Sequence, residues 1–291
     1  MQTKKTGILA TLGASIAWAF EPIFAKLSYI SSDFLATSAV RAIIVTLIAF
    51  IYALLTNNGN LRVTKKEFSV LVYIAFAGTL FADLIYLFAL TKVPVINAVL
   101  IGHMQPIFIV IMGFFWLKED KLTKFDYIGI CFMIFAGLLV TTKNLNNLAN
   151  LRLGTLYDLL VLLATVAWAT TGIAMRKYLK HMNAGVVTFY RFFISSVVFT
   201  IYLILIPYFP LSNIYQIIIG IIVGLGYILY YEGLKRIKAA QSSALELSTP
   251  FFATLLGFLI LGELVTSMQI LGILLLFVGV YFLSIKEEYI D

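Results

Sequence analysis

Ala14-Ser15-Ile16-Ala17-Trp18-Ala19, near the start of the chain, returns as Ala164-Thr165-Val166-Ala167-Trp168-Ala169. The second copy lies 150 residues after the first, and Arg41 recurs as Arg191 at the same offset. Weak internal similarity of this kind indicates a structural unit used twice. The sequence therefore predicts two related halves, residues 1–143 and 155–291, joined by a short polar linker at 144–154.

The composition excludes two ordinary soluble domains. Hydrophobic residues make up 62% of the chain and charged residues 12%, with a mean hydropathy of +1.00. Soluble domains average about 45–50% apolar and about 25% charged residues. A helix that crosses the hydrocarbon core needs roughly 20 mainly apolar residues. Ten stretches meet this need, at 7–27, 34–55, 68–90, 95–117, 125–142, 155–176, 184–206, 214–234, 240–261 and 267–285.

These stretches lack the period-two alternation of barrel strands, so we predict an all-α membrane protein. With the N-terminus in the cytoplasm, fifteen of the 21 Lys and Arg residues lie near inner helix ends and four near outer ends. The positive-inside rule then places both termini inside. Because each half has an odd number of crossings, the second half is predicted to be inverted relative to the first.

A second shared pattern ends the fourth helix of each half. Pro106, Leu117 and Glu119 recur as Pro250, Leu261 and Glu263, 144 residues on. Together with the small residues around the repeated Trp, this pattern resembles the repeat of the EamA-like branch of the drug/metabolite transporter superfamily. The resemblance implies ten helices and a cavity lined mainly by the first, third, fourth, sixth, eighth and ninth. It also implies alternating access for small metabolites.

Three carboxylates interrupt the apolar spans where that family usually has small or apolar residues: Glu21, Asp83 and Glu246. An ionisable residue at mid-span costs on the order of 3 kcal/mol and normally faces protein or water. We expect all three to line the cavity, to bind the substrate and to be candidates for proton coupling. The alternative for Glu21 is an ion pair with Lys26, and for Asp83 a pairing with His103 or an arginine.

The basic residues within the spans have two possible roles. An imidazole titrates near neutral pH, so His103 is a candidate for substrate binding and a proton relay, or else a hydrogen-bonded packing residue. Arg41 and Arg191 are gating candidates, because equivalent residues of inverted repeats would guard opposite mouths. The alternative for these arginines is structural pairing with Asp33 and nearby carbonyl groups.

The remaining substrate-binding candidates are aromatic: Trp18, Tyr86, Trp168, Tyr227 and Tyr230. Aromatic faces beside carboxylates suit an ammonium or guanidinium group. This combination favours a cationic or zwitterionic amine as the substrate.

We therefore predict a secondary active transporter that moves an amino acid or amine across the cytoplasmic membrane of a prokaryote. Proton coupling is one option, and gradient-independent exchange is the alternative. No phosphate-binding loop or metal-ligand spacing occurs, so neither a cofactor nor a metal is expected. The expected partners are the substrate and the lipid bilayer, and not nucleic acid. Formation of a homodimer is a further option. A channel and an intramembrane enzyme are remote alternatives.

Overall fold

The computed structural model describes residues 2–113, 115, 124–150, 154–205, 211–236, 245, 246 and 248–284. Within these ranges every regular element is a helix and no strand occurs, so the predicted all-α class is confirmed. Of the motif residues named above, Leu117 and Glu119 lie outside the described residues.

The helices follow the two halves of the sequence. The first half contains α1 (Gln2–Ser28), α2 (Phe34–Thr56), α3 (Lys65–Ile74), η1 (Ala75–Asp83), α4 (Leu84–Leu90), α5 (Val95–Gly102), α6 (Gln105–Met112), α7 (Lys124–Thr142) and the short α8 (Leu145–Ala149). The second half contains α9 (Leu156–Ala174), η3 (Met175–Leu179), α10 (Ala184–Leu205), α11 (Ile214–Arg236), α13 (Ser248–Leu261) and α14 (Ser267–Ser284). The η elements are π-helical turns that continue the preceding α-helix.

Six helical segments are long and apolar enough to cross a membrane: Lys5–Ser28, Phe34–Thr56, Lys65–Leu90, Leu156–Leu179, Ala184–Leu205 and Ile214–Arg236. Four shorter apolar helices are Val95–Ile109, Tyr127–Thr142, Thr249–Leu261 and Ser267–Phe282. All of them fall on stretches that the hydropathy of the sequence predicts as spans.

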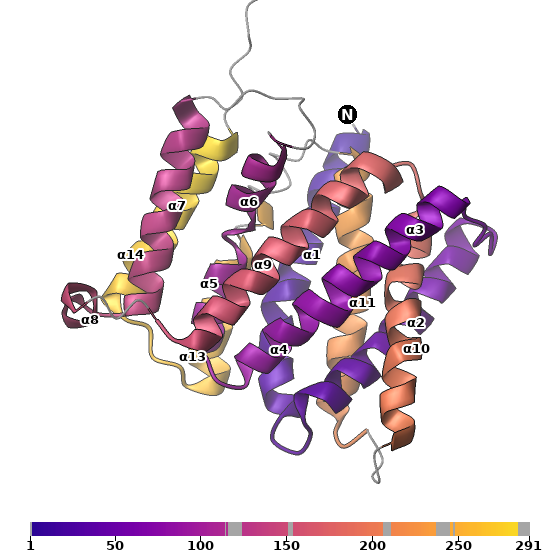
Figure 1. Ribbon diagram of the computed structural model, residues 1–291, viewed down its shortest axis with the longest axis horizontal. Helices are drawn as coiled ribbons and strands as arrows, with labels where there is room; N and C mark the ends of the chain where they lie inside the picture. The colour runs from indigo at the N-terminus through magenta and orange to yellow at the C-terminus, as the bar shows by residue number, and fades with distance from the viewer. Residues whose placement is uncertain are drawn as a thin grey trace, which may run out of the picture.

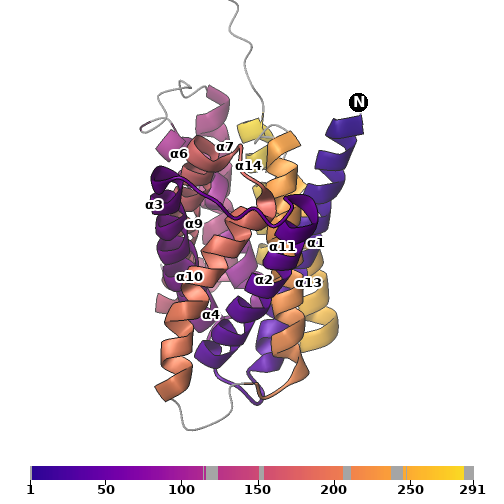
Figure 2. The same ribbon diagram turned by 90° about the vertical axis from the view of Figure 1, so that its right-hand side faces the viewer.

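The helices of the two halves pack in corresponding pairs. Helix α1 packs along α11, and its counterpart α9 packs along η1 and α4. Helix α2 packs on its own counterpart α10, and α7 packs on α14, which lie side by side at the left edge of Figure 1. Figure 2 shows α3 and α9 on one side of the molecule and α1, α11 and α13 on the other.

The fourth apolar stretch is a broken helix. Helix α5 ends at Gly102, a turn follows at His103 and Met104, and α6 begins at Gln105. Pro106 explains the break, because proline has no backbone N–H and its ring collides with the carbonyl group four residues earlier. Such interrupted helices are tolerated at membrane depth where they face protein or a cavity.

The motif residue Glu263 joins the two halves at the start of α5. Gly262 has a left-handed φ of +66°, which turns the chain at the end of α13. The Glu263 carboxylate accepts hydrogen bonds from the backbone N–H of Val95 (2.8 Å) and Ile96 (3.3 Å). It also pairs with Lys26 Nζ at 3.0 Å. A carboxylate at a helix N-terminus is favourable. Lys26 pairs with this carboxylate, and not with Glu21, the alternative pairing that the sequence suggested.

Replacing Glu263 with Ala is expected to destabilise the protein by about 0.5–2 kcal/mol, the usual range for the loss of a helix cap. The thermal unfolding midpoint in detergent measures this effect. Glu232→Ala is the control, since Glu232 pairs with Lys235 and Arg236 of its own helix end, and pairs near a surface contribute about 0–1 kcal/mol. Equal losses in the two variants would contradict a special role for Glu263.

Candidate functional site

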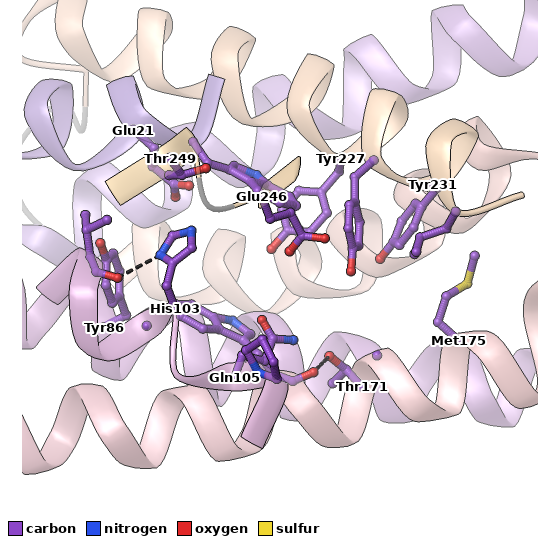
Figure 3. A pocket seen from close by; sticks show the side chains of 18 of the residues that line it. Glu21, Tyr86, His103, Gln105, Thr171, Met175, Tyr227, Tyr231, Glu246 and Thr249 are labelled. Atoms are coloured by element: carbon purple, nitrogen blue, oxygen red, sulfur yellow. Dashed lines mark hydrogen bonds between the residues drawn. The ribbon is translucent and has the colours of Figure 1, made fainter. Parts of the chain in front are cut away.

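A cavity of about 130 Å³ lies between helices of both halves, and Figure 3 shows it from close by. An engineered cavity of about 150 Å³ is large enough for benzene, so one small organic molecule fits. Predicted residues that line the cavity are Trp18, Glu21, Tyr86, His103, Trp168, Arg191, Tyr227, Tyr230 and Glu246. The structure thus brings together residues that lie far apart in the sequence, although Asp83 and Arg41 lie outside the wall.

Two groups of aromatic rings form much of the wall. Trp18 of α1 packs against Tyr227 and Tyr230 of α11, with ring centroids 5.8 and 4.9 Å apart. Tyr86 of α4 packs against Trp168 of α9 at 5.2 Å. The repeated tryptophans therefore sit in equivalent places. Each one packs against the third apolar span of the other half, Trp18 against α11 and Trp168 against α4. Ring faces in such a wall can hold a cation.

Polar groups face the cavity from opposite sides. Figure 3 shows Glu246, Tyr227 and Tyr231 on one side and Gln105 and Thr171 on the other. The wall thus offers hydrogen-bond acceptors and donors to a bound molecule from both halves of the chain.

Buried charges cluster in this wall and directly behind it. Asp83 Oδ2 lies 2.7 Å from Arg41 Nη2, and Asp83 Oδ1 lies 3.3 Å from Arg191 Nη2. Glu21 Oε1 lies 3.4 Å from Arg41 Nη1. Asp83 and both arginines are only 3% exposed. Two carboxylates thus balance two guanidinium groups, as buried charges require.

The expected placement of the two arginines at opposite mouths is wrong in this structure. Both reach the single carboxylate of Asp83, because each arginine lies about two turns inside its helix, a rise of about 10 Å. Since α2 and α10 pack together, the two long side chains meet in the middle. Asp33, the expected partner, instead caps α2 by accepting from the N–H groups of Leu35 and Ala36.

Arg191 is held from several further directions. Its Nε donates to Thr79 Oγ1 at 2.9 Å, and its Nη1 donates to the Tyr231 hydroxyl at 3.4 Å. Its guanidinium carbon also lies 4.2 Å from the ring centroid of Tyr227. Gly78 permits this arrangement, because a Cβ there would lie 2.9 Å from Arg191 Nη2.

His103 lies at the break between α5 and α6. Its ring Nδ1 is 2.7 Å from the Val99 carbonyl oxygen, a contact that fits the hydrogen-bonded packing role, while the side chain still borders the cavity. No group of three or more His, Cys, Asp or Glu that could hold a metal ion occurs among the residues that the structure describes.

Sequence reasoning missed several wall residues: Gln105, Thr171, Met175, Tyr231 and Thr249. Two of them had a signal. Gln105 directly precedes the helix-breaking Pro106, and Thr171 is the repeat equivalent of Glu21.

The sequence model of the EamA-like transporter family matches residues 5–142 and 155–285. The chain belongs to the EamA-like transporter family. The uncharacterized transporter sll1164 of Synechocystis is 29% identical over 233 residues, which are 75% of this chain and 66% of that relative, just under two thirds. The uncharacterized transporter YyaM of Bacillus subtilis is 26% identical over 249 residues, 81% of this chain and 78% of that relative.

The fold also occurs in a solved crystal structure of another protein. It superposes with a TM-score of 0.68 at 18% identity and covers 96% of this chain and 97% of the other. Membership of this family identifies a multi-pass integral membrane protein.

Gly78→Ala is expected to lower the thermal unfolding midpoint, because the new methyl group would push the firmly held Arg191 away from Asp83. Gly172→Ala in α9 is the matched control, since its Cβ would meet its nearest neighbour at 3.8 Å. Alanine usually favours a helix by about 1 kcal/mol over glycine, so the control should be neutral or more stable. A stabilised Gly78→Ala variant would show that Arg191 is free to move.

Proposed function

We propose that this protein is a secondary active transporter for a small cationic or zwitterionic amine, such as an amino acid, in the cytoplasmic membrane of a prokaryote. The main support is the composition of the cavity wall. Among its described residues are two carboxylates and six aromatic rings against one guanidinium group. Carboxylates attract an ammonium group, the rings stack against its methylene or methyl groups, and Arg191 suits the carboxylate of a zwitterion.

Alternating access fits the way the two halves pack. The cavity lies between them, and helices of one half pack directly on helices of the other, α1 on α11, α9 on η1 and α4, and α2 on α10. In a ten-helix arrangement with both termini inside, the halves are inverted and exchange roles as the molecule rocks. The Glu263 contact with Lys26 and the start of α5 then lies at the outer end, where it holds that end closed.

Proton coupling is the version of this function that the buried carboxylates favour. Glu21, Asp83, His103 and Glu246 all lie at the cavity or directly behind it. A proton on one of them would change the charge balance around the substrate. Gradient-independent exchange by the same rocking motion is the alternative.

Binding of amines should depend on Glu246. In a thermal-shift screen of amino acids, putrescine and choline on the purified protein, we expect a cationic or zwitterionic compound to raise the unfolding midpoint. Glu246→Gln should weaken that binding about tenfold or more, as the loss of a charge-assisted contact does, and Glu232→Gln should leave it unchanged. An acidic solute as the only ligand would contradict the amine preference.

Coupling is tested by uptake of the compound found in that screen into proteoliposomes, with and without an imposed pH gradient. We expect the gradient to drive accumulation in the parent protein, whereas Glu21→Gln retains exchange but loses accumulation. Equal uptake with and without the gradient would exclude proton coupling and leave the exchanger. Non-saturating conductance in an electrical recording would instead identify a channel.

A further inference from the structure

Asp83 touches two residues of the cavity wall without lining the cavity itself. Its Oδ1 accepts a hydrogen bond from the Trp168 indole Nε1 at 2.7 Å, and the same oxygen lies 3.3 Å from Arg191 Nη2. Trp168 and Arg191 both border the cavity. A carboxylate behind the wall therefore fixes where two side chains of the wall can lie.

The local backbone places Asp83 at the last position of the π-helical turn η1, which interrupts the rod from α3 to α4. π-Helical turns are rare, and they occur frequently at functional sites. Helix η1 packs on both α9 and α10, which carry Trp168 and Arg191. One side chain of the first half thereby reaches both residues of the second half.

Both oxygens of Asp83 are engaged, since Oδ2 accepts from Arg41 Nη2 at 2.7 Å. Short charge-assisted hydrogen bonds have strict geometry, and at 3% exposure Asp83 has little room to move. The indole of Trp168 is thus held by its N–H at one edge and by the ring of Tyr86 at 5.2 Å. The remaining charged group of the cluster, Glu21, faces Arg41.

We propose that Asp83 is the positioning residue of the cavity: it sets the orientation of Trp168 and the place of Arg191, and so the shape of the wall. This role rests on the proposed function in one respect, namely that a substrate binds against the cavity wall. It differs from simple neutralisation of the two arginines, which would place no requirement on Trp168.

The test follows the accessibility of Trp168 and needs no substrate. The chain has three tryptophans, so Trp18→Phe combined with Trp116→Phe leaves Trp168 as the only indole. In this background we expect Asp83→Ala to raise the acrylamide quenching constant of Trp168 about twofold or more. The loss of one hydrogen bond, about 1 kcal/mol, increases the population of displaced indole orientations about fivefold, and a displaced indole is more accessible to acrylamide. Asp83→Asn keeps an acceptor for the indole and should stay close to the parent value.

Asp158→Ala is the matched control. Asp158 is also buried, at 5% exposure, and lies on the same helix as Trp168, but it binds Asn97 and Thr155. Its loss should destabilise the protein and leave quenching of Trp168 unchanged. Because Asp83→Ala leaves two buried arginines with one carboxylate, Asp83→Ala with Arg41→Gln provides a charge-balanced second variant that should show the same increase in quenching.

Unchanged quenching in Asp83→Ala and in Asp83→Ala with Arg41→Gln would overturn the positioning role. An equal increase in quenching in Asp158→Ala would overturn it as well. The transport proposal fails separately. If no amine binds or is transported while Asp83→Ala still exposes Trp168, Asp83 remains the positioning residue of a cavity with a different ligand.

Discussion

Charge that is buried in an apolar slab must be neutralised within the molecule, because lipid offers neither water nor counter-ions. Here one carboxylate, Asp83, is shared by two arginines from different halves. This sharing requires α2, η1 and α10 to meet at one point, and the contact of Glu21 with Arg41 adds α1. The relative positions of four helices, and with them the back of the cavity, therefore depend on a single ion cluster.

Residues of the repeated sequence pattern, Pro106 and Glu263, act instead at helix ends and breaks. Gly262 turns the chain beyond α13, and Glu263 then binds the first N–H groups of α5 together with Lys26. Pro106 breaks the helix that this cap begins, so that His103 borders the cavity. Shared positions thus shape the helix ends and breaks. Glu21 and Glu246, whose equivalents in the other half are not carboxylates, lie in the cavity wall.

Hydropathy alone was sufficient to predict where the apolar helices lie, because span length is set by membrane thickness. The repeat likewise led to the wall residues Trp18 and Trp168. The partners of the charged residues could not be predicted in the same way. A sequence gives the depth of a residue along its helix, but not the helix that its side chain faces. Lys26 is one turn from Glu21 in the sequence and nevertheless pairs with Glu263, 237 positions away.

The two arginines are equivalent in sequence and unequal in their surroundings. Arg41 is paired with both Asp83 and Glu21, with a shortest contact of 2.7 Å. Arg191 has a longer contact of 3.3 Å to Asp83 and is otherwise held by hydroxyl groups and the ring of Tyr227. Since only Arg191 borders the cavity, a carboxylate in the cavity would compete with Asp83 for Arg191 alone. Asp83 and Tyr227 are repeat equivalents, so the carboxylate that holds Arg191 is present in the first half alone. Under the proposed function, one end of a zwitterion meets the guanidinium group of Arg191, and the other end meets Glu246.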